Sequence, residues 1–530
     1  MNELLERIIA SVVCAVVFCV MTVKLLGAMQ QSGYKNGRFW RWYARKDNLA
    51  CNRLSVLSLC LALATAVTSL CFSFLGVKTA LIASAAPFFA LLIAYLFADR
   101  KFALKVPANR TGRFSRLFAV YLLFTACFSF IFISLLYFLS ELNGSKLYAL
   151  IAYVPFALMP IFLPVLLCGA NGIAGIFENA RNKKFVKRAG QVLNEREILR
   201  VGIVGSYGKT SVKSVLKSIL SEKYAVVETP ESYNTPMGVA KTVFSPQFEG
   251  KQVFIAEMGA RKAGDIKELC DLVKPQYAVF TGVCAQHVAT FGSVENVYAE
   301  KSEIFRNGAK TVVCGAGLKT LAAGEETARF LEETAVANVR KTATETQFTL
   351  SLGGEKIEVK TALLGNAAVE NIAISALLAK EMGMTTGEIA KGIEKITPVA
   401  HRLQLIESGG VYILDDGYNC NIVGAGEAID ALCRFEGGKC IVTPGIVECG
   451  VLEEEINGEL GEKIAQAKLD KIILVGDTLV GAVKSGYQKA GGDESKLQTA
   501  KTLEAAKALL SDWVQTGDAV LFLNDLPDVY

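Results

Sequence analysis

Glycine, lysine and threonine stand together where an apolar run gives way to a helical pattern. The run Leu199–Val204 is β-like, and the helical pattern continues to about Leu220. The loop between them supplies six residues of interest, namely Gly205, Ser206, Gly208, Lys209, Thr210 and Ser211. In such a loop, N–H groups at a helix N-terminus bind phosphate, the lysine reaches the β- and γ-phosphates, and the threonine can hold Mg²⁺. The sequence therefore predicts nucleotide binding. A tight strand-to-helix turn is the alternative, because Ile203 occupies the first glycine position of the common pattern.

A carboxylate and a histidine follow two further strand-like runs. Glu257 ends the run Val253–Ala256, and its carboxylate is a hard oxygen ligand suited to Mg²⁺. Pairing with Arg261 or Lys262 is the alternative. His287 is one of two histidines in the chain, and a structural role is the alternative to a metal-binding one.

The order of these and later motifs resembles one family. The matching segments are Gly202–Thr210, Tyr233–Val239, Glu257–Ala260 with Gly264–Ile266, His287 with Phe291–Ser293 and Ala299–Phe305, Arg402–Gln404, and Asp415–Asn421. Each is weak alone, whereas the ordered set resembles the Mur ligases of bacterial cell-wall synthesis from about residue 200 onwards. Within that family, the resemblance is to the members that add D-alanyl-D-alanine to UDP-N-acetylmuramoyl-tripeptide.

The resemblance implies an ATP-dependent, ADP-forming ligase of peptidoglycan precursor synthesis. Such an enzyme joins a carboxylate to an amine, here D-alanyl-D-alanine or a related amine, through an acyl phosphate. The transferred phosphoryl group carries dense negative charge, so Lys209 and Mg²⁺ would stabilise it.

The resemblance also assigns roles to individual residues. It implies Lys209, Glu257, His287 and Lys301 as catalytic residues, and Thr210, Glu257, His287 and Lys301 as the metal site. Lys301 would be carbamylated by CO₂. This reaction requires the neutral amine, so a lowered lysine pKa would favour it. The alternative is a surface lysine that pairs with Glu300 or Glu303. Asn371 would contact adenine, Arg402 a phosphate and Asp416 the ribose. The alternative for these three is a surface or hinge polar residue.

Two departures from the family concern nucleotide binding and the acceptor substrate. The family's G-x-H-N-x-x-N segment reads Gly365–Asn371 here, with alanine in place of its histidine and first asparagine. No segment before Arg200 can supply the αβ domain that binds a UDP-sugar, because apolar runs stand there instead. A lipid-linked cell-wall precursor presented at the membrane is therefore the hypothesis for the substrate, beside a soluble one.

Five apolar runs in the first third of the chain are long enough to span a bilayer core of ~20 residues. They are Ile8–Leu26, Ser55–Leu75, Thr79–Ala98, Leu117–Leu139 and Leu147–Cys168. The segments after the first, third and fifth runs are rich in Lys and Arg. Because basic loops stay in the cytoplasm, the sequence predicts a multi-pass protein of the bacterial cell membrane with its N-terminus outside and its catalytic part inside. The spans contain almost no charge, which argues against a transporter or channel.

The predicted organisation follows from these segments. Residues 1–170 form a five-helix transmembrane domain and 171–199 a basic amphipathic linker. Residues 200–396 form an α/β central ATP-binding domain around the phosphate loop, and 397–530 a Rossmann-like C-terminal domain. In the latter, strands are expected at Val411–Leu414, Cys440–Val442, Lys471–Val475 and Ala519–Leu523.

Composition excludes some other classes. Met1–Glu195 contains 21 basic and 7 acidic side chains, and the rest of the chain contains 35 and 44. The basic residues flank apolar runs, so they indicate membrane topology rather than nucleic-acid binding. The 14 cysteines include no C-x-x-C pair, which makes a zinc site or a disulfide framework unexpected.

Two other functions remain open on the sequence alone. A membrane-associated poly-γ-glutamate-type polymer ligase combines spans with similar chemistry, although the Arg402–Gln404 and Asp415–Asn421 segments favour the peptidoglycan reading. A catalytically inactive scaffold that recruits cell-wall synthesis enzymes is the other alternative, and the intact set of Lys209, Glu257, His287 and Lys301 argues against it.

Overall fold

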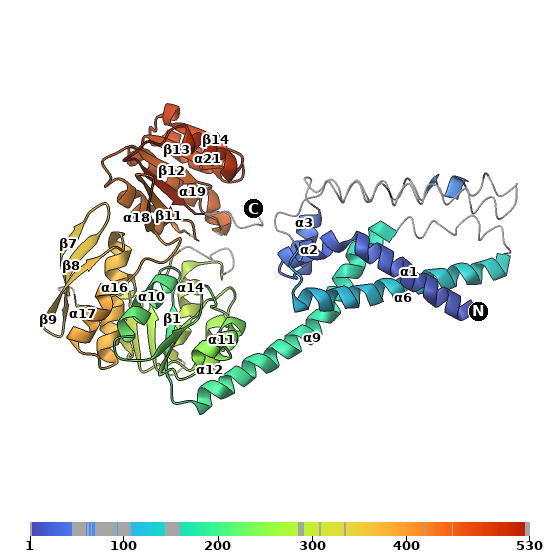
Figure 1. Cartoon of the computed structure of the whole chain (residues 1–530), viewed down its shortest axis with the longest axis horizontal. Helices are drawn as coiled ribbons and strands as arrows, with labels where there is room; N and C mark the ends of the chain where they lie inside the picture. The colour runs from blue at the N-terminus through green and yellow to red at the C-terminus, as the bar shows by residue number, and fades with distance from the viewer. Residues whose placement is uncertain are drawn as a thin grey trace. The chain divides into compact units, whose positions relative to one another are not determined.

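The computed structural model of the chain contains two compact units, one up to Asn182 and one over Lys183–Leu526 (Figure 1). The structure describes residues 3–44, 60, 63–64, 66–68, 71, 93, 108–143, 159–284, 291–306, 309–332, 335–418, 420–447 and 449–524.

The first unit is mostly helical in its described part, and the rest of that part is turn or coil. Its helices are α1 (Glu3–Met21), α2 (Val23–Gln31), α3 (Asn36–Tyr43), α6 (Gly112–Asn143) and the start of α9 (Met159–Glu195). Within the described ranges, two helical segments are long and apolar enough to cross a membrane, Gly112–Leu135 and Ile161–Glu195, and a third is added if the bent pair Arg7–Cys19 and Val23–Gln31 is one span. The predicted runs Ser55–Leu75 and Thr79–Ala98 lie mostly outside the described residues, as do residues 147–158 of the last run. Five spans therefore remain a prediction.

The sequence predicted a single helix over the first apolar run, but the structure has two helices there. The run breaks at Thr22, where the two parts meet at 55°. The Thr22 hydroxyl donates to the carbonyl of Phe18 at 2.8 Å, a local bond that bends helices. It also contacts the Tyr121 hydroxyl on α6 at 3.0 Å. The break is thus stabilised by packing against a helix about 100 residues away in the chain.

Helix α9 runs without interruption from Met159 to Glu195. The predicted boundary between the last span and the basic linker therefore falls inside one helix. Gly172 and Gly175 do not end it, and their positions have open space around them. The last turns of α9 belong to the second unit, where Ala189 and Leu193 are buried in its core.

The second unit begins with a six-stranded parallel sheet in the order β2-β3-β1-β4-β5-β6. The strands are β1 (Leu199–Val204), β2 (Val226–Glu228), β3 (Val253–Glu257), β4 (Tyr277–Phe280), β5 (Thr311–Cys314) and β6 (Ala328–Arg329). The helices are α10 (Lys209–Leu220), α11 (Pro236–Val243), α12 (Asp265–Val273), α14 (Val294–Lys301), α15 (Glu303–Arg306), α16 (Gly365–Glu381) and α17 (Thr386–Glu394). Parallel strands joined by helices bury both sheet faces, so their sequences are almost continuously apolar.

Alternate residues of β1 explain the two layers of helices. Val201 and Ile203 face α10, α16 and α17, whereas Val204 faces the side of α11 and α12 (Figure 1). Because β1 lies between β3 and β4, the loop after β1 opens at the middle of the carboxyl edge of the sheet. Ligands of open α/β sheets bind at such an edge.

A small antiparallel sheet, which the sequence did not predict, follows the parallel one. It consists of β7 (Val336–Lys341), β8 (Thr346–Leu352) and β9 (Glu355–Thr361). Phe348, Leu350, Ile357 and Val359 alternate along β8 and β9, and they join the core around α10 and α16.

The last part of the chain forms a second six-stranded sheet in the order β10-β11-β15-β12-β13-β14. Its strands are β10 (Gln404–Ser408), β11 (Val411–Asp416), β12 (Lys439–Thr443), β13 (Lys471–Val475), β14 (Leu497–Ala500) and β15 (Ala519–Leu523). Its helices are α18 (Ile422–Leu432), α19 (Glu453–Gln466), α20 (Val480–Lys489) and α21 (Leu503–Ser511). Only β10 is antiparallel to its neighbour. The four strands expected here are present, and the predicted α/β class of the central and C-terminal parts is confirmed.

Candidate functional site

The loop between β1 and α10 is held in a shape that needs glycine at two positions. Gly208 is the N-cap of α10 in the left-handed conformation, with φ of 72°. Gly205 has φ of 150°, and a Cβ there would lie 1.9 Å from the Thr281 Oγ1. Thr281 in turn donates to the Tyr207 carbonyl, and the Ser206 N–H donates to the Gly282 carbonyl at 2.8 Å. The phosphate loop is therefore fixed against the end of β4.

Two lysine ammonium groups and a helix N-terminus converge on this loop. Lys209 Nζ donates to the carbonyls of Gly205 at 2.8 Å and Ser206 at 3.3 Å, and Lys301 Nζ donates to Gly205 at 3.0 Å. The buried Ser206 hydroxyl has no hydrogen-bond partner among the described residues. Burial lowers the pKa of Lys209, and the charge of Glu257 opposes this effect. Clustered cations, loop N–H groups and an unsatisfied hydroxyl are features that suit a bound anion.

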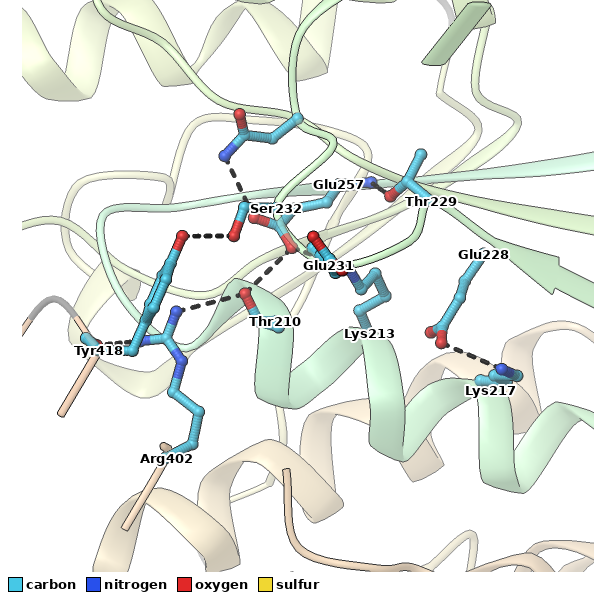
Figure 2. A network of polar contacts seen from close by, with 11 residues as sticks. Thr210, Lys213, Lys217, Glu228, Thr229, Glu231, Ser232, Glu257, Arg402 and Tyr418 are labelled. Atoms are coloured by element: carbon cyan, nitrogen blue, oxygen red, sulfur yellow. Dashed lines mark hydrogen bonds and ion pairs between the residues drawn. The ribbon is translucent and has the colours of Figure 1, made fainter. Parts of the chain in front are cut away.

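Glu257 lies at the end of β3 in the polar network of Figure 2. Its Oε2 accepts from the Thr210 hydroxyl at 3.1 Å and from Lys213 Nζ at 3.2 Å, and its Oε1 accepts from Asn234 at 3.3 Å. The structure thus pairs Glu257 with Lys213, not with Arg261 or Lys262. A carboxylate beside a P-loop threonine hydroxyl is the oxygen donor set that suits Mg²⁺.

Lys301 is not a surface lysine, because only 1% of it is exposed. Its neighbour Glu300 accepts instead from the N–H groups of Gly264 and Ile266, and Glu303 pairs with Arg306. Burial, followed by the charge of Lys209, lowers the pKa of Lys301 to about 7. Near neutral pH a substantial part of this lysine is therefore a neutral amine.

Arg402 brings the C-terminal domain to the phosphate loop, and Asp416 supports the backbone beside it. Arg402 Nη2 lies 3.5 Å from the Thr210 hydroxyl, and its Nη1 donates to the Tyr418 carbonyl at 2.9 Å. The guanidinium also stacks on the Tyr418 ring, 4.5 Å from its centroid. Asp416 accepts from the Leu403 N–H at 3.0 Å, and Leu403 has a φ of 47°. This bond supports an unusual backbone conformation directly after Arg402.

The other predicted residues are placed as follows. Asn371 on α16 packs beside the loop, because its Oδ1 would lie 3.2 Å from a Cβ on Gly208. Ser211 lies in the first turn of α10. His287 lies outside the described residues. His401, for which the sequence suggested no role, contacts Asp415 Oδ2 at 2.8 Å.

The segment Gly365–Asn371, which differs from the family pattern, contacts the C-terminal domain through Asn366. The backbone N–H and the amide of Asn366 donate to the carboxylate of Glu427 on α18, at 2.7 and 2.6 Å. Lys341 also donates to Asn366. Glu427 thereby connects the N-terminus of α16 to the C-terminal domain.

Sequence reasoning missed Lys213, Ser232 and Tyr418. Lys213 lies three residues after Thr210 on α10, so helical spacing puts both on one face and was the available signal. The contact of 2.5 Å between the Ser232 and Tyr418 hydroxyls joins residues 186 positions apart, and no local pattern announces it.

Three cysteines that looked scattered in the sequence line one small apolar pocket. They are Cys284, Cys420 and Cys449, together with Asn421, Ile422, Ile446 and Ile456. Across the described ranges, no group of three or more His, Cys, Asp or Glu side chains is arranged to hold a metal ion.

Comparison with known proteins finds a family model that matches the region around this site. Residues 203–379 match the Mur ligase middle domain. This stretch contains the phosphate loop, Glu257, Lys301 and Asn371.

Curated relatives are similar over a longer stretch. The UDP-N-acetylmuramoyl-tripeptide–D-alanyl-D-alanine ligase of Escherichia coli is 28% identical over 294 residues, covering 52% of this chain and 64% of its own length. The Bacillus subtilis enzyme of the same name is 28% identical, covering 52% of this chain and 62% of its own length. The chain thus spans less than two thirds of these relatives.

Solved structures show the same fold. MurF from Acinetobacter baumannii superposes with a TM-score of 0.60 at 22% identity, over 66% of this chain and 78% of that one. The MurF ligase from Thermotoga maritima in complex with ADP superposes with a TM-score of 0.59 at 25% identity, over 66% of this chain and 81% of that one.

Proposed function

We propose that this chain, whose residues 203–379 form a Mur ligase middle domain, is an ATP-dependent carboxylate–amine ligase of cell-wall precursor synthesis. The observation that carries the proposal is the contact between Thr210 and Glu257 beside a phosphate loop that holds the partly buried Lys209 and the buried Lys301. This arrangement supplies anion binding and a hard-metal site at one place.

ATP is the proposed phosphoryl donor. The cations around the phosphate loop and the orphaned Ser206 hydroxyl suit a triphosphate, and a similar MurF structure is named as a complex with ADP. Asn371, Arg402 and Asp416 are the proposed adenine, phosphate and ribose contacts. Because the last two lie on the C-terminal domain, they would contact the nucleotide only when the two domains are together.

Mg²⁺ is the proposed metal, and the residues present fit it. Thr210 and Glu257 would provide two oxygen ligands, and phosphate oxygens and water would complete the set, as is usual for Mg²⁺. His287 and a carbamylated Lys301 are proposed for a second ion. When bound, the metal would neutralise charge on the transferred phosphoryl group.

The proposed reaction has two steps. A carboxylate oxygen of the acceptor attacks the γ-phosphorus of ATP, ADP leaves, and an acyl phosphate forms. The amine then attacks the acyl carbon, inorganic phosphate leaves, and the amine loses a proton. Lys209 would stay on the phosphoryl oxygens throughout, and Arg402 and Tyr418 would cover the loop and exclude water from the acyl phosphate.

D-Alanyl-D-alanine or a related amine is the proposed nucleophile, by similarity to the curated ligases. The acceptor carboxylate would belong to a muramoyl-peptide precursor, either soluble and UDP-linked or carried on a lipid. The apolar helices of the first unit and the basic segments around them support a location at the cytoplasmic face of the cell membrane. The proposed organisation keeps the domains 1–170, 171–199, 200–396 and 397–530.

Mass spectrometry of the products tests the proposal. Full-length protein is incubated with ATP, Mg²⁺, UDP-N-acetylmuramoyl-tripeptide and D-alanyl-D-alanine, with and without membrane lipid extract. A pentapeptide product in the soluble reaction supports the curated relatives' reaction. A ligated product only with lipid extract supports a lipid-linked acceptor. No ligated product and no ADP in any arm would refute ligase activity and favour an inactive scaffold.

A further inference from the structure

Lys213 forms the most deeply buried ion pair near the candidate site. Its side chain and that of Glu257 are each 3% exposed, and Nζ lies 3.2 Å from Glu257 Oε2. A lysine is rarely buried unless it is paired, because losing water costs its charge a great deal. By contrast, Lys217, one turn further along α10, pairs with Glu228 at the surface with a side chain that is 47% exposed.

Lys213 determines which carboxylate oxygen of Glu257 accepts the charged hydrogen bond. Oε2 receives the ammonium of Lys213 and the hydroxyl of Thr210, whereas Oε1 receives only the neutral amide of Asn234 at 3.3 Å. The charged donor therefore sets the rotation of the carboxylate. It also places a positive charge beside a group that we propose as a metal ligand, so the lysine and a divalent cation compete for the same negative charge.

Lys213 has a second contact, to the loop that follows β2. Its Nζ donates to the carbonyl of Glu231, a non-glycine residue with a φ of 44°. The next residue, Ser232, contacts the Tyr418 hydroxyl of the C-terminal domain at 2.5 Å. Figure 2 shows Lys213 beside Glu257 and Glu231. It also shows the contact of Ser232, the residue after Glu231, with Tyr418, whose carbonyl accepts from Arg402.

We propose that Lys213 is a positioning residue that couples the carboxylate of Glu257 to docking of the C-terminal domain through Glu231, Ser232 and Tyr418. The inference rests on the proposed function, since it concerns the same metal and nucleotide site. One ammonium group holds the metal-binding carboxylate in place and, at the same time, holds the loop that receives the covering domain.

The coupling predicts opposite effects on metal binding and on turnover. Lys213→Met removes the competing cation, so Mn²⁺ used in place of Mg²⁺, with ADP, should bind about tenfold more tightly. The same variant releases the Glu231 carbonyl and misplaces Ser232, so kcat should fall about ten- to a hundredfold. A merely structural role would weaken binding and turnover together.

The experiment uses full-length protein in detergent. Mn²⁺ binding in the presence of ADP is followed by the EPR signal of unbound Mn²⁺, and kcat by ADP release with both substrates. Lys217→Met is the matched control and should leave both unchanged. Lys213→Arg keeps the charge and should keep the wild-type Mn²⁺ affinity; this variant also serves if Lys213→Met does not fold. Weaker Mn²⁺ binding in Lys213→Met, or tighter binding in Lys213→Arg, would overturn the proposal.

A double-mutant cycle tests the coupling itself. Tyr418→Phe removes the hydroxyl that meets Ser232, and should lower kcat without changing Mn²⁺ affinity. If both residues act through one loop, the double variant Lys213→Met/Tyr418→Phe has the kcat of the worse single variant. Multiplied losses would instead show independent roles and refute the coupling. Failure of the wild type to bind Mn²⁺ and ADP would count against the proposed function, whereas the outcomes above concern Lys213 alone.

Discussion

Two lysines that differ in burial donate to the same backbone carbonyl at the phosphate loop. Lys209 and Lys301 both donate to Gly205, so their charges repel each other at short range. Lys301 is the more deeply buried of the two and has a pKa lowered to about 7, with burial as the main cause. A lysine that is partly neutral at physiological pH can react with CO₂, whereas an ordinary lysine is almost fully protonated there.

The proposed carbamylation of Lys301 should therefore follow pH through about 7. The carbamate forms from the neutral amine and releases a proton, so at a fixed concentration of dissolved CO₂ its amount should rise from pH 6 to pH 8. ¹³C NMR with labelled CO₂ measures the carbamate, and Lys301→Gln is the control that should lack the signal. No carbamate at pH 8 in the wild type would contradict the assignment.

Asp416 gives a second pH-dependent expectation. Burial raises its pKa from 3.8 to about 6, although the Leu403 N–H and Arg402 oppose the shift. Between these two values the folded protein holds a proton that the unfolded chain has released, so stability falls as pH rises through this window. Asp416→Asn lacks the titration and should gain up to about 3 kcal/mol relative to the wild type between pH 4 and pH 7.

Melting temperatures of the detergent-solubilised proteins across this pH range measure the difference. Asp415→Asn, at the neighbouring position, is the comparison variant. A constant difference between Asp416→Asn and the wild type at all pH values would show that the carboxyl group does not titrate in this window.

At the scale of elements, the phosphate loop depends on its fit against β4. Gly205→Ala would place a Cβ 1.9 Å from Thr281 Oγ1, in a backbone conformation that side chains rarely adopt. The loop would have to move away, at a cost of about 3 kcal/mol or more. We expect a lower melting temperature and loss of the stabilisation that ADP gives the wild type. Gly324→Ala, which enters open space, should behave as the wild type in both measurements.

Several elements could be predicted because their signals are local. An apolar run followed by a glycine-rich turn specified β1 and α10, and β13 and β15 were predicted with the bounds that the structure has. The antiparallel sheet β7–β9 was missed. Its strand β7 is mostly exposed and has no alternating pattern, whereas β9 alternates in burial but was not separated from the surrounding pattern. The break at Thr22 depends on Tyr121, and no local rule announces such a contact.

The residues of the candidate site also divide into those with a local sequence signal and those placed by long-range packing. The Lys209 and Thr210 pattern is contiguous in sequence, so it was visible. The contact of Glu257 with Lys213 was not predicted, because Lys213 lies 44 residues away in the chain and reaches the carboxylate only after β3 and α10 have packed together. The burial of Lys301 also follows from packing, so the sequence left a surface position open.

For the whole molecule, we expect one orientation in the membrane. The distribution of basic segments predicts an N-terminus outside and the domains after residue 200 inside. Protease added to intact spheroplasts should remove an N-terminal tag and leave a C-terminal tag protected, and after lysis it should reach both. Protection of the N-terminal tag together with loss of the C-terminal tag would contradict this orientation.

We propose that the phosphate loop supports ATP-dependent ligation. The most direct test measures ADP release and ligated product together, in full-length wild type, Lys209→Ala and the exposed control Lys217→Ala. We expect one ADP per amide formed in the wild type and the control. Turnover in Lys209→Ala should fall by at least about a hundredfold, because one charge at the transferred phosphoryl group changes the rate by about this much. Equal turnover in Lys209→Ala and the wild type would contradict the claim.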